Sequence, residues 1–297
     1  MQKFLLDASE ELVLNNPTYK KVVGLYVWQA YLNDVGSGDI TTELFVPDKA
    51  AFISAEIVAK EAGVLAGMQE AEWFLKKQDI KIASGKKDGY NLKKGDIIMR
   101  LSGRADKILA SERILLNLLR RMSGVATATN NLVKKVPKSI RILATRKTLW
   151  GDLDKRAVAV GGGATHRLNL SDAILIKDNH LVLNEDFKSV VLSLNKAKKV
   201  RFTEIELDNL TQVQLFAESF KQSDRRRNFV VMLDNFSPDN VQKAVKILSK
   251  SDILIEVSGG INEKNIKKYV IKGVSAISSG AITNKAGSLD FSLNILR

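Results

Sequence analysis

The chain has 297 residues, 45% of them hydrophobic and 27% charged, so it is long enough for one large core or two moderate ones and disorder is not expected. It has no cysteine, which excludes disulfides, thiolate metal sites and a cysteine nucleophile. The opening residues MQKFLLDASEELVL carry three acids and one lysine, unlike a signal peptide, and no apolar run approaches the length of a membrane span. We therefore expect a cytoplasmic protein with no membrane partner.

The formal net charge of +13 raises the question of nucleic-acid binding. The basic residues are spread along the whole chain, however, and aromatic residues do not interleave with them as stacking platforms would. Most of these charges fit a solvated surface, and some could raise the local concentration of an acidic substrate. We expect no nucleic-acid partner.

The first 110 residues predict a separate α+β domain. The stretches AFISAEIVAKEAGVLAG and LKKGDIIMRLSGRA indicate twisted strands around glycine turns, with helices near each end of the region. Next, residues 110–124 place apolar side chains at helical spacing, which predicts a helix that leads into a second domain. Arg113 lies on the first turns of this helix.

From about Arg141 onward, short β-branched runs alternate with segments of helical spacing. The predicted strands are residues 141–145, 173–176, 203–207, 229–233, 253–257 and 274–278. Ser237 and Pro238 predict a helix start, and a further helix is expected from near Asn262 to Gly273. Runs that are apolar on both faces indicate parallel strands covered by helices, in a barrel or an open doubly wound sheet. The small residues after the last two strands favour the barrel, where such loops commonly bind phosphate.

Charged residues recur at the carboxyl ends of these strands, which share one mouth in an α/β barrel. The candidates are Arg146, Lys147, His166, Arg167, Lys177, Glu206 and Asp234. Four cations and a histidine could surround a polyanion, while the two acids could hold hydroxyls, a divalent ion or developing positive charge. Each residue taken alone also fits a solvated side chain, a turn or a helix cap; their recurrence at successive strand ends favours transfer of a phosphorylated sugar.

Most of these candidate residues lie within longer sequence motifs. The motifs are ATRKT (144–148), GGGATHRLNLSDAILIKDNH (161–180), EIEL (204–207), MLDNF (232–236), EVSGGI (256–261) and SGAITNKAGSLDFSL (279–293), preceded by GDITTE (38–43), AKEAGVLAG (59–67), KKGD (93–96) and ERILLNLLRRMSGVATAT (112–129). In order and spacing the chain resembles the quinolinate phosphoribosyltransferase family over nearly its whole length. The resemblance implies an α/β fold: an incomplete parallel α/β barrel preceded by an α/β sandwich domain. It places the sandwich domain at residues 1–112, rejoined by the C-terminal tail at about 284–297, and the barrel domain at residues 113–283.

The same resemblance implies a decarboxylating phosphoribosyl transfer in NAD biosynthesis. Quinolinate and phosphoribosyl pyrophosphate, assisted by Mg²⁺ and no organic cofactor, would give nicotinate mononucleotide, pyrophosphate and CO₂. The implied catalytic residues are Lys147, Lys177, Glu206 and Asp234. The implied substrate-binding residues are Arg113, Arg146, His166, Arg167, Ser258, Gly259, Gly260 and Gly280. Arg113 matches an arginine that the neighbouring subunit supplies, so a homodimer with a shared active site is implied.

The chain departs from the common family pattern around Trp150, at Thr165, where asparagine is usual, and at Asn284, where histidine is frequent. Three alternatives stay open on the residues alone. They are a paralogous phosphoribosyltransferase of the same fold acting on another acid, a Schiff-base lyase that uses Lys177, and a nucleic-acid binder that rests on net charge.

Overall fold

The computed structural model describes residues 4–184, 186–194, 200–220 and 228–296. Its contacts divide the chain into two compact units. The barrel unit comprises residues 1–8, 131–147 and 163–284, and the antiparallel unit comprises residues 9–130, 148–162 and 285–297. Among the described residues, no helix combines the length and apolar character that crossing a membrane requires.

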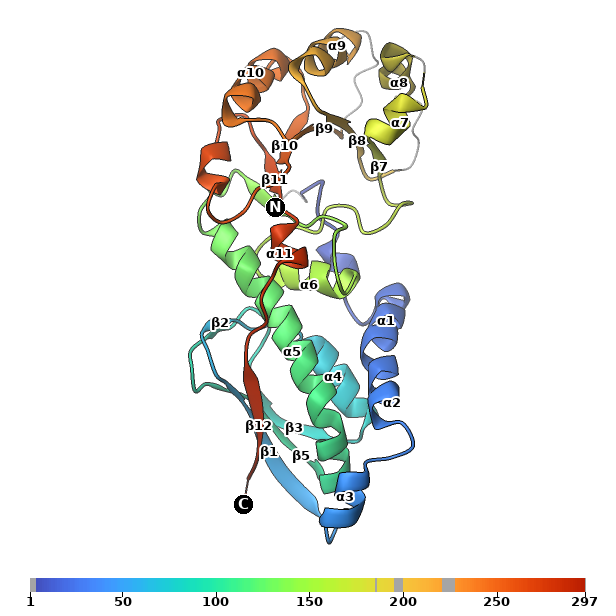
Figure 1. Cartoon of the computed structure of the whole chain (residues 1–297), viewed down its shortest axis with the longest axis vertical. Helices are drawn as coiled ribbons and strands as arrows, with labels where there is room; N and C mark the ends of the chain where they lie inside the picture. The colour runs from blue at the N-terminus through green and yellow to red at the C-terminus, as the bar shows by residue number, and fades with distance from the viewer. Residues whose placement is uncertain (1–3, 185, 195–199, 221–227, 297) are drawn as a thin grey trace. The chain divides into compact units, whose positions relative to one another are not determined.

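The antiparallel unit is built on a four-stranded sheet in the order β12-β1-β5-β3 (Figure 1). Its strands are β1 (Phe52–Ala59), β3 (Lys81–Gly85), β5 (Ile97–Arg104) and β12 (Phe291–Leu296), beside a small pair β2 (Gly63–Val64) and β4 (Asn91–Leu92). Its helices are α1 (Pro17–Val23), α2 (Gln29–Val35), α3 (Ile40–Phe45), α4 (Met68–Lys77), α6 (Asp152–Val160) and most of α5 (Ala105–Val133), with a 3₁₀ turn at Ser9–Glu11 and a π-helical turn at Gly24–Trp28. The C-terminal strand β12 pairs with β1, so the end of the chain lies in this unit.

The domain boundary expected between residues 112 and 113 falls inside α5, which runs without interruption from Ala105 to Val133. Contacts assign this helix to the antiparallel unit as far as Asn130. The reason is that its apolar face stays buried beyond residue 112, through Leu115, Leu119 and Met122. The helix expected at 110–124 is therefore part of a longer one.

The barrel unit contains a six-stranded parallel sheet in the order β6-β11-β10-β9-β8-β7. Its strands are β6 (Arg141–Leu143), β7 (Ile174–Ile176), β8 (Thr203–Leu207), β9 (Phe229–Asp234), β10 (Leu254–Ser258) and β11 (Ala276–Ser278). All six lie where the sequence predicts them. Because β6 and β7 follow one another in the chain but lie at opposite edges, the sheet has the strand order of a barrel that is open between them. The expected α/β class with an incomplete parallel barrel is confirmed.

Helices connect several of these parallel strands: α7 (Asp178–Val182) and α8 (Phe187–Ser193) follow β7, α9 (Leu210–Phe220) follows β8, and α10 (Pro238–Leu248) follows β9. Helix α11 (Ala281–Asn284) comes after the last barrel strand, β11. Helix α10 begins as predicted, with the Ser237 hydroxyl accepting the Asn240 N–H. The helix expected from Asn262 to Gly273 is wrong: only a 3₁₀ turn forms, at Ile266–Tyr269. The amides of Asn262 and Asn265 both donate to the Gly260 carbonyl, just before this turn.

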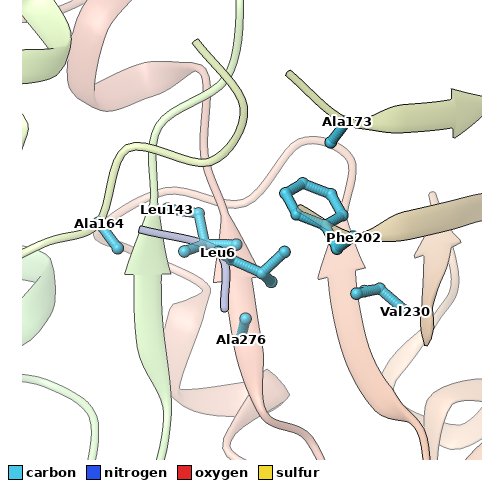
Figure 2. Close-up of a cluster of buried hydrophobic side chains, with 7 residues drawn as sticks. All are labelled: Leu6, Leu143, Ala164, Ala173, Phe202, Val230 and Ala276. Atoms are coloured by element: carbon cyan, nitrogen blue, oxygen red, sulfur yellow. The ribbon is translucent and has the colours of Figure 1, made fainter. Parts of the chain in front are cut away.

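A cluster of buried apolar side chains lies between the strands of the barrel unit (Figure 2). It contains Leu6, Leu143, Ala164, Ala173, Phe202, Val230 and Ala276. Leu6 comes from the beginning of the chain, and the other members come from the strands or from residues beside them. The cluster lies near the amino ends of most strands, which leaves their carboxyl ends for polar side chains.

Candidate active site

One pocket opens at the carboxyl ends of the barrel strands. Its empty volume is about 690 Å³, open solvent at its mouth included. It is lined by Ala144, Thr145, Arg146, Lys147, His166, Arg167, Leu175, Lys177, Glu206, Met232, Asp234, Glu256, Ser258 and Ser278. The structure thus brings together all seven charged or histidine candidates from the strand ends, and Ser258 with them.

Strand register explains why these residues meet. Glu206 of β8, Met232 of β9 and Glu256 of β10 are consecutive partners in the parallel ladder, so they share one level of the sheet. One level further on, Asp234 pairs with Ser258. Glu204 and Glu206 are two residues apart on β8 and therefore point to the same face. The pocket is a consequence of the period-two alternation along neighbouring strands.

Four cations face this pocket at close quarters. Arg146 and Lys147 follow β6 and are exposed, while Arg167 is only 5% exposed. Burial, followed by the like charge of Arg146, lowers the pKa of Arg167. The Arg167 guanidinium donates to the Ala173 carbonyl at 3.2 Å, which fixes its direction. Binding of an anion between crowded cations is favourable, because it relieves the repulsion between them. Guanidinium groups also pair with carboxylates through two parallel hydrogen bonds.

Lys177 lies beside the acids of the pocket. Its Nζ donates to Glu206 Oε2 at 2.9 Å. Burial raises the pKa of Glu206, and the hydrogen bond from Lys177 acts against that shift. His180 is exposed on α7, where its Nδ1 accepts the Lys177 N–H at 3.0 Å. Lys177 is thus held at both its backbone and its ammonium group, within the same pocket as the other cations.

Beneath the pocket, His166 contacts two buried glutamates. Its Nε2 lies 2.9 Å from Glu204 Oε2 and 3.4 Å from Glu256 Oε2, and both glutamates are fully buried. Burial by itself lowers the pKa of His166, but the carboxylates, Glu204 foremost, outweigh it and raise the pKa to about 9. Burial, followed by the charge of Glu256, raises the pKa of Glu204 to about 7. The imidazole and the two carboxylates therefore form one buried, electrostatically coupled cluster.

A hydrogen bond fixes the orientation of the His166 ring. The Arg167 N–H donates to His166 Nδ1 at 2.8 Å. The other ring nitrogen, Nε2, faces Glu204. This orientation keeps Nδ1 bound to the backbone of Arg167, the cation next to it.

The small-residue loops lie directly beyond the pocket-lining ends of β10 and β11. Gly259 and Gly260 follow Ser258 with φ of 94° and 62°, a left-handed region that favours glycine. A Cβ on Gly259 would lie 2.3 Å from Asn235 Oδ1, so the two loops approach more closely than any side chain allows. A Cβ on Gly280 would meet Lys147 Cδ at 3.7 Å, which places this glycine beside a pocket cation.

Arg113 is the one expected site residue in the antiparallel unit, where it is exposed on α5. Its expected role from a neighbouring subunit stays a prediction. Trp150 also belongs to the antiparallel unit, and its ring stacks on Tyr26 with centroids 6.3 Å apart. Asn284 is exposed at the end of α11, where its N–H donates to the Gly280 carbonyl.

Sequence reasoning missed Glu204 and Glu256. Both lie inside strands, β8 and β10, whereas the candidates weighed lie at or near the carboxyl ends of strands. A signal was present: an acid inside a strand that is buried on both faces needs a partner, and the spacing of Glu204 and Glu206 puts both on one face.

Two family models together match most of the chain. The N-terminal domain of quinolinate phosphoribosyl transferase matches residues 39–123, and its C-terminal domain matches residues 125–294. A protein of Archaeoglobus fulgidus named "Probable nicotinate-nucleotide pyrophosphorylase [carboxylating]" is 39% identical over 274 residues, 88% of this chain and 99% of the relative. A protein of the same name from Bacillus subtilis is 35% identical and covers 95% of each chain.

Solved structures agree with the sequences. The nicotinate-nucleotide pyrophosphorylase of Francisella tularensis superposes with a TM-score of 0.81 and 32% identity, over 93% of this chain and 96% of that one. Both units of the chain are therefore covered by relatives of one kind, in sequence and in fold. The chain belongs to the quinolinate phosphoribosyltransferase family.

Proposed function

We propose that the protein transfers the phosphoribosyl group of phosphoribosyl pyrophosphate to quinolinate, with loss of CO₂, to form nicotinate mononucleotide and pyrophosphate. The observation that carries the proposal is the pocket itself, where four cations and His166 converge at the carboxyl ends of parallel strands, together with Glu206, Asp234 and Glu256. Both substrates are multiply charged anions, and this pocket offers each of them a set of cations. The relatives' names describe the same reaction class.

The dicarboxylate would be bound by Arg146, His166 and Arg167. Arg167 is directed by the Ala173 carbonyl, and His166 lies next to it with its Nδ1 bound to the Arg167 N–H. Guanidinium forks match carboxylates, so the two arginines would hold the ring with its nitrogen toward the sugar. Arg113 of a neighbouring subunit would complete this half of the site, and the active form would be a homodimer.

The phosphoribosyl half would lie between the lysines and the glycine loops. Ser258, Gly259, Gly260 and Gly280 would bind the 5′-phosphate through backbone N–H groups, and Lys147 and Lys177 would neutralise the leaving pyrophosphate. Glu206 and Asp234 would stabilise the cationic sugar that forms as pyrophosphate departs. Once ribosylated, the ring nitrogen is positively charged and accepts the electrons left when the neighbouring carboxylate departs as CO₂; that carbon then takes a proton.

The residues present fit the expected Mg²⁺. Glu206, Asp208 and Asp234 each offer a carboxylate oxygen, and these oxygens lie within 4.8 Å of one another. Hard oxygen donors of this kind suit Mg²⁺, so these three acids would hold it. When bound, the ion would neutralise part of the pyrophosphate charge. No organic cofactor is needed for this chemistry, and the expected cytoplasmic location stays a prediction.

The decisive assay follows CO₂ and pyrophosphate from quinolinate, phosphoribosyl pyrophosphate and Mg²⁺, with nicotinate replacing quinolinate as the control. Equal release of both products with quinolinate alone supports the proposal. Binding of phosphoribosyl pyrophosphate without turnover of quinolinate would refute it and favour a paralogue that acts on another acid.

Variants assign the roles. Arg146→Ala and Arg113→Ala should weaken quinolinate binding, and Glu206→Ala should mainly lower kcat. Each change should cost about 2–4 kcal/mol, in binding free energy for the arginines and in activation free energy for Glu206, because the site is desolvated when substrate is bound. Mixing the Arg113→Ala and Lys147→Ala proteins should restore activity if two subunits share the site. Exchange of subunits without any recovery would contradict the shared site.

A further inference from the structure

The beginning of the described chain forms part of the barrel unit. Residues 4–8, which we call the N-terminal strap, are assigned to this unit by their contacts. Leu6 is fully buried in the apolar cluster between the strands, near Leu143 and Phe202 (Figure 2), and Ala8 is fully buried as well. The strap is therefore anchored by side-chain burial, independently of the hydrogen bonds that it makes.

Those hydrogen bonds converge on the residues just before Arg167. The His166 N–H donates to the Leu6 carbonyl at 2.9 Å, and the Ala8 N–H donates to Thr165 Oγ1 at 2.8 Å. The Thr165 N–H donates to Asp7 Oδ1 at 3.3 Å. The Thr165 hydroxyl in turn donates to the His166 carbonyl at 2.9 Å. Both backbone groups of His166 are thus bound, one by the strap and one by the residue that the strap holds.

His166 needs this support because of its backbone conformation. Its φ is 55°, in the left-handed region that non-glycine residues seldom adopt. Such a conformation persists only where the surroundings impose it, and it is frequent at functional sites. Here it turns the imidazole toward Glu204 and leaves Nδ1 to accept the Arg167 N–H. A relaxed backbone at His166 would redirect both His166 and Arg167.

We propose that the strap and Thr165 are positioning residues of the quinolinate site. They hold His166 in the left-handed conformation and thereby set the direction of His166 and Arg167; the assignment of that half of the pocket rests on the proposed function. Neither Thr165 nor the strap lines the pocket, so they act through His166 and Arg167. Thr165, a departure from the common family pattern, acquires a definite role in this chain.

The position of the strap predicts a selective effect. It binds the residues that would hold the carboxylates. The phosphate loops after β10 and β11 are held by other hydrogen bonds; for example, the Ser279 hydroxyl donates to the Ile261 carbonyl at 2.6 Å. Loss of the strap contacts should therefore weaken quinolinate binding and spare phosphoribosyl pyrophosphate. A purely structural role would instead lower stability and alter the two KM values together.

The test compares three variants of the whole protein. Thr165→Val removes the hydroxyl but keeps the shape, and Thr165→Ser keeps the hydroxyl. Thr129→Val is the matched control, since Thr129 is also fully buried and donates its hydroxyl to a backbone carbonyl, that of Val125, within the antiparallel unit. We expect Thr165→Val to raise the quinolinate KM about tenfold, as loss of one to two buried hydrogen bonds predicts, and to change the KM for phosphoribosyl pyrophosphate less than about twofold.

Thr165→Ser should restore the quinolinate KM, and Thr129→Val should lower Tm without moving either KM. Should Thr165→Val not fold, Asp7→Ala removes the acceptor of the Thr165 N–H and is expected to act in the same direction. An equal rise of both KM values in the strap variants, or no rise in the quinolinate KM, would overturn the proposal.

Amide hydrogen exchange supplies a readout that does not depend on turnover. Residues 164–168 should exchange faster in Thr165→Val than in Thr129→Val, because the His166 N–H loses the geometry of its bond to Leu6. Wild-type protein that fails to convert quinolinate refutes the proposed function, and this exchange comparison still decides whether the strap holds His166. Equal exchange in the two variants refutes the positioning role whatever the substrate is.

Discussion

Gly259 and Gly260 offer a matched pair of substitutions in the proposed phosphate loop. Both have positive φ, 94° and 62°, so alanine at either position lowers the unfolding free energy, because a residue with a Cβ is strained in this left-handed conformation. They differ in their surroundings. A Cβ on Gly259 would lie 2.3 Å from Asn235 Oδ1 and 2.6 Å from the Asn235 backbone nitrogen, whereas a Cβ on Gly260 would meet nothing within 4 Å. Only Gly259→Ala forces two loops apart.

The two terms set the magnitudes. The left-handed backbone costs a non-glycine residue about 1–2 kcal/mol, which is the whole effect expected for Gly260→Ala. Gly259→Ala adds an overpacking term of about 1–3 kcal/mol, for a total of about 2–5 kcal/mol. The added methyl group of Gly259→Ala would push against Asn235. The Asn235 N–H donates to the Ser258 carbonyl at 3.0 Å, and the Asn235 amide donates to Asp234 Oδ2 at 2.6 Å. Displacing Asn235 therefore disturbs the acid next to it.

The assay combines urea unfolding with steady-state kinetics. Gly259→Ala should lose more stability than Gly260→Ala and should raise the KM for phosphoribosyl pyrophosphate, while the quinolinate KM changes little. Each glycine serves as the control for the other, because the backbone term is common to both. Equal losses of unfolding free energy would refute the close approach of the two loops.

Three further predictions concern the antiparallel unit. Arg121 donates two hydrogen bonds to the fully buried Asp154, at 2.8 and 2.7 Å, so Arg121→Leu should leave an uncompensated charge and lower the unfolding free energy by about 3–5 kcal/mol in urea titration. Burial raises the pKa of Glu70, so its native form binds a proton more tightly than the unfolded form; stability falls as pH rises above 4.5 through the native pKa. Glu70→Gln, which keeps an acceptor for Tyr19, should therefore gain Tm relative to wild type as pH rises from 4 to 8, and a constant difference would contradict this. Asp39→Ala removes the N-cap of α3 and should cost about 1 kcal/mol, measured by thermal unfolding.

The order and positions of the barrel strands follow from local pattern. Strand β9 is apolar from Phe229 to Leu233 in the sequence, the pattern expected of a parallel strand with both faces covered, and all five of these positions are buried. Charged residues that end such runs must lie at one edge of a parallel sheet, so Lys177, Glu206 and Asp234 could be placed together before any contact was known. For these residues, sequence period and topology suffice.

Other features depend on contacts that no local pattern records. The strap meets Thr165 across more than 150 residues of chain, and its own sequence shows only a short apolar segment. The segment after Asn262 has apolar residues at helical spacing, yet it forms only a 3₁₀ turn at Ile266–Tyr269, so apolar spacing alone does not ensure a helix. The extent of α5 was underestimated because helices end where their packing ends, and its apolar face stays buried well beyond the predicted end.

The placement of charge in the barrel unit follows from what the pocket has to bind. Glu204 and Glu256 are fully buried and both face His166, and their charge raises the pKa of its imidazole. Their side chains are thus paired with the ring, whereas Arg146 and Lys147 are exposed at the ends of the strands. Arg146, Lys147, Arg167 and Lys177 supply the attraction for an entering anion, opposed by Glu206 and Asp234. The overall charge of +13 then acts in the same sense, because a basic protein draws anionic substrates toward a mouth that is itself basic.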